Sequence, residues 1–364
     1  MKKGDYEMKH TWKQLRTLIS SAAAASLLLV SLSACQSGQP AGSPSGGDSS
    51  KPSQAVTIKV SHTNAEGGGT DLAAKDFKAA VDAADASLDI QLYGNNQLGA
   101  ERPVFESVLT GTVEMQIIST SVLATVIPEA YVMNVPFLFD DVTQFWEVVN
   151  TDAFYDVFST SFEAKGLHFL GFMNCNDRAV ANTVREIHTP EDMHGMKIRV
   201  LEGEVYTDLF TALGCNTSVV PITELYTSLS QGMVEGEDLG IAYLVPNKYV
   251  EVEKYYTDTN HTMQPLAAIV NLSVWNKLSA DQQKALEDAV KAAGDGARDR
   301  YSSLLEEYYA TAENDYGMVI THLTDEERQA FKDATADVSE KYANLNVGCR
   351  ATYDVIQEII TGGK

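Results

Sequence analysis

The sequence is poor in cysteine, histidine and basic residues. It has four cysteines, seven histidines and 27 lysines and arginines against 50 acidic residues in 364 positions. No two cysteines have the C-x-x-C spacing of zinc or thiol-exchange sites, so we expect no structural metal and no cofactor. A formal net charge of −23 repels nucleic-acid phosphate and anionic membrane surfaces. Nucleic acid is therefore excluded as a partner.

Motifs of common catalytic sites are also missing. His188 and His194 do not form an H-E-x-x-H pair, and no G-x-S-x-G elbow, phosphate-binding G-x-x-x-x-G-K loop or G-x-G-x-x-G turn is present. Cys175 is unpaired, and such a cysteine beside a strand is more typical of a small buried side chain than of a nucleophile. We therefore predict no catalytic residues and no enzymatic activity.

Only one long hydrophobic run is present, and it lies near the N-terminus. Residues 18–30 are apolar, follow Lys9, Lys13 and Arg16, and are too short to span a bilayer stably. The run ends in Leu-Ser-Ala-Cys35, which resembles the lipobox of bacterial lipoproteins. This predicts a signal peptide over 1–34 and an acylated Cys35. The alternative is a plain signal peptide with an incidental cysteine, and translation could start at Met1 or at Met8.

Residues 35–54 are rich in serine, glycine, proline and glutamine and carry almost no apolar side chain. Such a composition cannot offset the entropy of ordering the chain. We predict a flexible tether between a membrane anchor and a folded body.

The remaining chain has the alternating strand and helix periodicity of α/β proteins, with 44% hydrophobic residues overall. A first unit is predicted from strands and helices over 56–60, 72–81, 88–92, 104–109, 113–118 and 167–173. A second unit begins at a capping pattern over 189–192 and continues with strands 197–200 and 217–220, a helix over 206–213 and a helix capped by Thr223. Capping boxes predict that a long helix begins at Ser279 and another at Thr324. We expect two lobes with a parallel sheet covered on both faces.

Six segments, in the same order, resemble the extracytoplasmic substrate-binding proteins of tripartite ATP-independent (TRAP) transporters. They are 96–102 (Asn-Gln-Leu-Gly-Ala-Glu-Arg), 111–114, 135–139 (Val-Pro-Phe-Leu-Phe), 189–200 (ending Lys-Ile-Arg-Val), 224–236 and 275–279. The resemblance implies a two-lobed α/β fold of the periplasmic-binding-protein type, joined by crossing strands and a long helix. It implies lobes made of 55–176 with 265–305 and of 177–264 with 306–364.

The resemblance also implies a function. A monomeric, lipid-anchored protein outside the cytoplasmic membrane captures a small organic acid anion and delivers it to the membrane subunits of a cation-coupled TRAP permease. An ABC-importer lipoprotein shares the architecture and the lipobox and stays open as an alternative, as do, less favoured, a surface enzyme and an adhesin. The sequence does not name the ligand.

Two arginines match the family's ligand-binding positions. Arg199 occupies the arginine of the Lys-Ile-Arg-Val segment, which binds the ligand carboxylate, and Arg178 lies 21 residues earlier where a second one is found. A guanidinium suits this role because its planar fork pairs both carboxylate oxygens and stays charged when buried. Arg185 is interpreted as a surface or structural charge.

Other positions depart from the family. After Gly236 the family often has Gln-Glu-Asn, the Asn contacting the carboxylate, whereas this chain has Glu237, Asp238 and Leu239. Leu239 either lines the site, favouring a less polar ligand, or faces the core while an amide such as Asn174 or Asn271 replaces the contact. Ile222 occupies a position where the family commonly has an aromatic residue, and Ser119 and Val122 replace the charged pair of sialate binders. We therefore expect a small hydroxy or keto acid in preference to a sialic acid or a large polyhydroxy sugar acid. The remaining candidates are Asp238, Glu101 in the Leu-Gly-x-Glu position, and Glu202 near Arg199.

Overall fold

The computed structural model describes residues 55–362, which fold around one mixed sheet. The strand order is β2-β1-β3-β8-β4-β7-β5-β6, with β9 paired to β8. The signal peptide, Cys35 and the tether predicted from the sequence lie outside the described residues. None of the helices between residues 55 and 362 is long and apolar enough to cross a bilayer.

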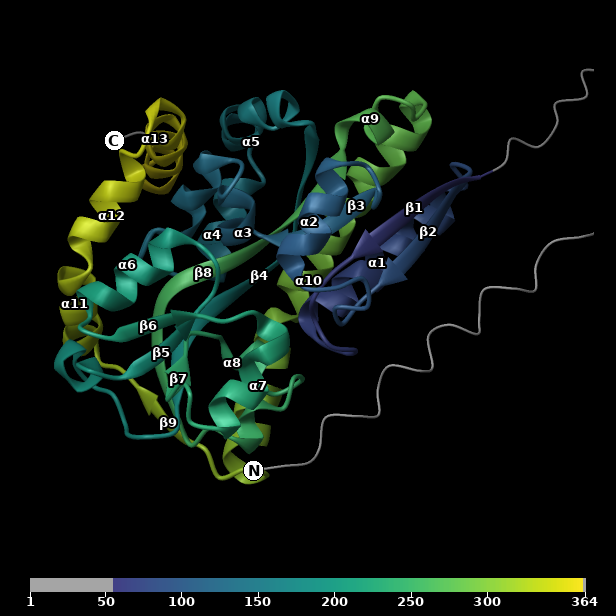
Figure 1. Ribbon diagram of the computed structural model, residues 1–364. Helices are drawn as coiled ribbons and strands as arrows, with labels where there is room; N and C mark the ends of the chain where they lie inside the picture. The colour runs from purple at the N-terminus through teal and green to yellow at the C-terminus, as the bar shows by residue number, and fades with distance from the viewer. Residues whose placement is uncertain (1–54, 363–364) are drawn as a thin grey trace, which may run out of the picture. The chain divides into compact units, whose positions relative to one another are not determined.

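Two long strands at the centre of the sheet connect its two halves. β4 (Leu167–Asn182) and β8 (Tyr255–Asn271) pair antiparallel along nearly their whole length, with bulges that bend them, and cross the middle of the molecule in Figure 1. β3 with β8 and β4 with β7 are antiparallel as well. The prediction of a parallel sheet is therefore wrong at the centre and correct only for the flanking strands, because β8 returns through both halves and had no clear strand pattern in the sequence.

The first lobe is built on the parallel strands beside the end of β8. β1 pairs with β2 and β3 in parallel register, and helices cover the sheet. Its elements are β1 (Val56–Ser61), α1 (Gly69–Ala84), β2 (Leu88–Tyr93), α2 (Glu101–Leu109) and β3 (Met115–Ser119). The alternating apolar side chains of β1, with Ile58 and Val60 fully buried, face a core shared with α1.

The second lobe is built on β5, which pairs in parallel with β6 and β7. Its elements are β5 (Lys197–Val200), α6 (Glu204–Ala212), β6 (Asn216–Val219), α7 (Ile222–Ser230), β7 (Gly236–Glu237), α8 (Ile241–Leu244), η5 (Tyr249–Glu251) and β9 (Val319–His322). Pro221 precedes the first residue of α7, so Thr223 lies inside this helix and the predicted cap is wrong by two residues. Pro221 has no side chain that can cap the helix, so α7 begins without a side-chain hydrogen bond at its N-cap.

Helix α10 (Ala280–Asn314) links the two lobes and begins at the predicted capping box of Ser279 and Gln282. Its first half packs into the core of the first lobe through Leu286 and Val290, and its second half packs into the core of the second lobe through Tyr308 and Ala312. A Cβ at Gly294 would lie 2.8 Å from the carbonyl oxygen of Phe172, so glycine allows the helix to approach β4 closely.

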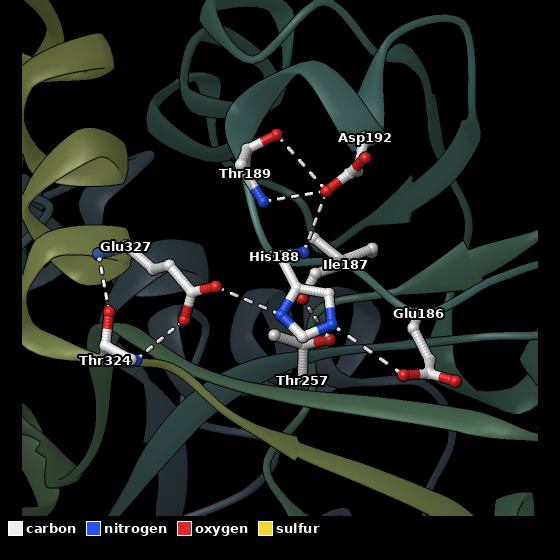
Figure 2. Close-up of polar contacts among 8 residues, drawn as sticks. All are labelled: Glu186, Ile187, His188, Thr189, Asp192, Thr257, Thr324 and Glu327. Carbon is white, nitrogen blue, oxygen red and sulfur yellow. Dashed lines mark hydrogen bonds and ion pairs between the residues drawn. The ribbon is translucent and has the colours of Figure 1, made fainter.

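Two predicted helix N-terminal caps lie close together at the protein surface, on either side of His188 (Figure 2). Thr189 and Asp192 close the capping box of η4 (Pro190–Met193), and Thr324 and Glu327 close that of α11 (Asp325–Ala334). His188 lies between them, with Nδ1 3.1 Å from the Glu327 carboxylate. Hydrogen bonds from the Thr324 backbone hold the pKa of Glu327 below its usual value. The contact between His188 and Glu327 connects the start of α11 to the second lobe.

The remaining elements pack around a large apolar core that includes α6 and the C-terminal helices. They are α3 (Thr120–Ala124), η1 (Pro128–Asn134), α4 (Val142–Val149), α5 (Asp152–Phe158), η2 (Ser159–Ser161), η3 (Glu163–Lys165), α12 (Ala336–Ala343) and α13 (Val347–Thr361). The short helix α9 (Leu272–Trp275) packs instead into the core of the first lobe through Trp275. Cys175, Cys215 and Cys349 are buried and carry no disulfide. The limits predicted for the lobes stay a prediction, because the sheet continues through them.

Candidate functional site

A small cavity lies where the two lobes meet at the central strands. It receives side chains from the first lobe, from β4 and β8, and from the second lobe, and its volume is about 20 Å³. The lining residues are Thr63, Glu101, Asn176, Arg199, Leu201, Ile222, Leu239, Tyr243, Gln264 and Leu266. Four predicted site residues are therefore brought together here: Arg199, Glu101, Ile222 and Leu239.

Arg199 is the cationic group of the cavity and is fully buried. Its Nε donates a 2.8 Å hydrogen bond to the carbonyl oxygen of Val220, which fixes the side chain against the end of β6. Its Nη1 and Nη2 have no hydrogen-bond partner among residues 55–362. Burial lowers the pKa of Arg199 although Asp238 opposes this shift. A buried guanidinium with two unpartnered NH₂ groups is a strong donor for a carboxylate.

Glu101 faces the cavity from the N-terminus of α2. Its Oε1 accepts a 2.7 Å hydrogen bond from the backbone N–H of Ser119, which explains why Ser119 is near the site without lining it. Burial raises the pKa of Glu101, and the Ser119 hydrogen bond limits the rise. The cavity therefore offers an acceptor from the first lobe and a cationic donor from the second.

Leu239 is buried in the core of the second lobe and also lines the cavity, so both alternatives for this residue stay open. Asn174 bonds to Thr70 and Asn271 bonds to the carbonyl of Val108, so neither supplies the missing amide. The amides in the cavity are Asn176 and Gln264, which are directly opposed on β4 and β8. Neither of the amides named in the second alternative lines the cavity.

A wider groove of about 430 Å³ adjoins the cavity and shares Ile222 and Tyr243 with it. Asn95 and Asn96 border this groove from the first lobe, and Tyr249 borders it from the second. The rings of Tyr243 and Tyr249 stack at 12° with centroids 6.3 Å apart. The groove therefore lies next to the cavity, with Ile222 and Tyr243 between them.

Arg178 lies outside the cavity lining, in a buried ion pair. Its Nε and Nη2 donate hydrogen bonds of 3.0 and 2.7 Å to the two carboxylate oxygens of Asp238, and its guanidinium lies 4.6 Å from the centre of the Tyr206 ring. Although burial opposes the charge, Asp238 raises the pKa of Arg178. Nη1 alone is unpartnered within the described chain. Its contact with the ligand stays a prediction.

Glu202 is placed away from the cavity. It is 43% exposed and lies 3.4 Å from Nη1 of Arg102, as a surface ion pair. Its predicted hydrogen bond to the ligand has no geometric support in this structure, since the carboxylate faces Arg102. No group of three or more His, Cys, Asp or Glu side chains between residues 55 and 362 is arranged to bind a metal.

Six lining residues were not predicted from the sequence: Thr63, Asn176, Leu201, Tyr243, Gln264 and Leu266. Asn176 could have been found, because it is two residues before Arg178 and follows a predicted strand. Gln264 could not, because β8 showed no strand signal. Tyr243 sits in a helix of four residues that is too short to leave a pattern.

The comparisons with known proteins identify the family and the fold. The family model of bacterial extracellular solute-binding proteins, family 7 (DctP), matches residues 60–345. A "solute-binding protein" of Verminephrobacter eiseniae is 30% identical over 202 residues, which are 56% of this chain and only 60% of that relative. The 2,3-diketo-L-gulonate-binding periplasmic protein YiaO of Escherichia coli is 26% identical over 77% of this chain and 84% of its own length.

Solved structures show the same fold. A TRAP periplasmic solute-binding protein from Roseobacter denitrificans, solved with bound β-D-glucuronate, superposes with a TM-score of 0.78 at 24% identity, over 83% of this chain and 99% of that one. The two-lobed architecture is thus that of TRAP binding proteins. The chain belongs to family 7 of the bacterial extracellular solute-binding proteins, which serve transport and are not enzymes.

Proposed function

We propose that this protein captures a small organic acid anion between its lobes and holds the ligand carboxylate with Arg199. The observation that carries this is the pair of buried, unpartnered Nη atoms of Arg199 in the cavity. Burying a charge without a partner is costly, so a protein keeps such a group where a ligand supplies the counter-charge. Glu101, Asn176 and Gln264 then accept or donate hydrogen bonds to the rest of the ligand.

Ligand entry requires the cavity to open. A volume of about 20 Å³ holds roughly one water molecule and no organic acid. Since Thr63 and Glu101 belong to one lobe and Arg199 and Ile222 to the other, separating the lobes widens the cavity toward the groove. We propose that the ligand binds to the open form and that closure completes its hydrogen bonds.

The ligand is proposed to be a small hydroxy or keto acid. Leu239 presents methyl groups beside Arg199 and offers no amide, so one polar contact is replaced by apolar surface. The YiaO relative is named for a keto sugar acid and the Roseobacter structure holds glucuronate, which keeps sugar acids in the range to be tested. A thermal-shift screen followed by calorimetry with a four-carbon hydroxy acid, a keto acid, D-glucuronate and sialate tests this. Stabilisation by none of the carboxylates would contradict the function, and preference for sialate would contradict the ligand class.

Anchoring is proposed to occur through Cys35, with residues 36–54 as a tether that lets the lobes reach a permease. Membrane anchoring by one acyl chain is marginal, so two or more chains on this cysteine are needed. Replacing Cys35 with Ala should release the protein from the membrane fraction or leave it unprocessed. Unchanged partition of Cys35→Ala with membranes would contradict the lipoprotein assignment.

Delivery is proposed to be to a cation-coupled TRAP permease, with the binding protein acting as a monomer. The family match favours this over an ABC importer. Genes for one small and one large membrane protein beside this one, and ligand uptake that depends on both and on a cation gradient, are the expected findings. ATP-dependent uptake through an ABC permease would support the alternative.

A further inference from the structure

Two carboxyl groups near Arg199 are buried without hydrogen-bond partners. Glu237 lies on β7 and Glu253 between η5 and β8, and their exposed fractions are 0% and 3%. All four of their carboxyl oxygens are unpartnered among the described residues. Buried polar atoms are satisfied in most proteins, so a buried pair with four unpartnered oxygens calls for a functional explanation.

The sheet register places Glu237 beside Arg199. Ile198 of β5 and Gly236 of β7 are paired in parallel, so the next residues, Arg199 and Glu237, are neighbours on one face of the sheet. Side chains alternate along a strand, and Asp238 therefore points away from Glu237, toward Arg178. Glu237 and Arg199 nevertheless form no ion pair within 4.0 Å in the described part of the chain, since none of the ion pairs there joins them.

The charges around these groups are unbalanced in a specific way. Arg178 is matched by Asp238, which leaves Arg199 beside Glu237, and Glu237 in turn interacts with Glu253. Burial, followed by the field of Glu253, raises the pKa of Glu237 well above its usual value, while Arg199 and Arg178 oppose the rise. Burial raises the pKa of Glu253 to about 8. The other ionisable groups facing Arg199 and this pair are Tyr243, Tyr249 and Glu101. With both glutamates protonated, Arg199 keeps one unmatched positive charge.

We propose that Glu237 and Glu253 are charge-setting residues of the ligand site, which leave Arg199 available to a ligand carboxylate when they are protonated and compete with that carboxylate when they ionise. This rests on the proposed role of Arg199. The glutamates do not touch the ligand in this scheme; they are positioning residues that act through the guanidinium. Anion binding is thereby linked to protonation of the two glutamates. The affinity for the ligand anion is retained at neutral pH and falls as the pH rises.

Calorimetry with D-glucuronate between pH 6 and pH 9.5 tests the linkage. In the wild type, affinity should fall above about pH 8, by up to about tenfold per pH unit for each proton lost. Glu237→Gln and Glu253→Gln keep the side-chain shape and remove a titrating group, and their affinity should depend less on pH. Glu235→Gln is the matched control. Glu235 lies two residues before Glu237 and its carboxylate accepts from the Lys197 N–H, outside the cavity, so this variant should keep the wild-type profile.

A second measurement needs no ligand. A carboxyl group whose pKa is raised by folding keeps its proton in the folded state between about pH 4.5 and pH 8 and loses it in the unfolded state, so the wild type should lose stability as the pH rises through this window. The loss amounts to up to about tenfold in the folding equilibrium constant per pH unit for each proton. Denaturant titrations should show a shallower loss in both Gln variants and the wild-type loss in Glu235→Gln.

The outcomes separate the two proposals. Parallel stability profiles of wild type and both Gln variants, or an affinity for glucuronate that stays constant to pH 9.5 in the wild type, would overturn the charge-setting role. If no carboxylate binds at any pH while the stability profiles differ as expected, the proposed organic-acid function is contradicted. The raised pKa of Glu237 and Glu253 would then still be supported.

Discussion

The molecule contains two fully buried arginines, 21 residues apart, whose surroundings differ in one respect. Arg178 on β4 gives its Nε and Nη2 to the two oxygens of Asp238, whereas Arg199 on β5 gives only its Nε to a backbone carbonyl. Asp238 raises the pKa of Arg178, and burial lowers that of Arg199. Arg178 and Arg199 are therefore equally buried, but the charges around their guanidinium groups differ.

The difference makes Arg199 the better candidate for the ligand-binding charge, while a ligand contact by Arg178 stays a prediction. The bidentate interaction with Asp238 offsets much of the desolvation energy of burying Arg178. Removing either partner would leave the other charge buried and unpaired. Arg199 has no internal counter-charge within 4.0 Å among residues 55–362, so its burial is repaid only when an anion enters the cavity. Substituting each arginine should separate loss of stability from loss of binding.

The largest effect is expected for Arg178→Ala. It leaves the Asp238 carboxylate fully buried beside His261, whose Nε2 lies 3.8 Å away, and should lower the free energy of unfolding by about 3–5 kcal/mol. Denaturant titration measures this. Arg185→Ala, at an exposed position in the same part of the chain, is the control and should change stability by less than about 0.5 kcal/mol. Equal free energies of unfolding for the two variants would show that the Arg178–Asp238 ion pair does not stabilise the fold as expected.

Arg199→Ala should mainly affect binding. Truncating one partner of a buried charge pair costs about 2–5 kcal/mol, or roughly 30- to 4,000-fold in dissociation constant. Arg199→Lys should recover only part of the affinity, because an ammonium cannot form the planar fork. Calorimetry with the best acid of the screen measures both. Unchanged affinity in a folded Arg199→Ala protein would remove the central contact of the proposed function.

The ligand contacts predicted for both arginines stay predictions, but the sequence indicated the position of Arg199 and did not indicate the ion pair of Arg178. Arg199 stands in a local motif, and its position at the end of a short strand follows from that motif. The partner of Arg178 is 60 residues away, on a different strand, and no local pattern reports such a pairing. Asp238 was therefore a candidate without a role until the fold brought it to Arg178.

The elements of the fold also differ in whether a local sequence pattern predicts them. The capping boxes at Ser279 and Thr324 are local hydrogen-bond patterns, and both predictions are confirmed. β8 contains polar residues and Pro265 within a buried, antiparallel strand, and its polar positions are tolerated because they pair with β4 and the cavity. Pro265 and the polar residues before it are disfavoured inside a strand, although β8 also contains Tyr, Thr, Ile and Val, which favour one.

The smallest effect is expected at Leu239, which lines the cavity next to the face that carries Arg199 and lies one residue after the partner of Arg178. Leu239→Asn adds an amide on the Arg199 side of the comparison and leaves the Arg178–Asp238 pair in place. A new hydrogen bond to a polar ligand is worth about 0.5–1.5 kcal/mol, so affinity should shift toward hydroxylated acids and away from less polar ones by roughly two- to tenfold.

Leu239→Ala is the control for this change, because it removes the same methyl groups without supplying an amide. Paired calorimetric titrations of one hydroxylated and one less polar monocarboxylate give the selectivity of each variant. A gain for the hydroxylated acid in the Asn variant alone identifies the amide as its cause. Equal selectivity in wild type, Asn and Ala variants would mean that Leu239 does not contact the ligand, and that Asn176 and Gln264 provide the polar recognition beside Arg199.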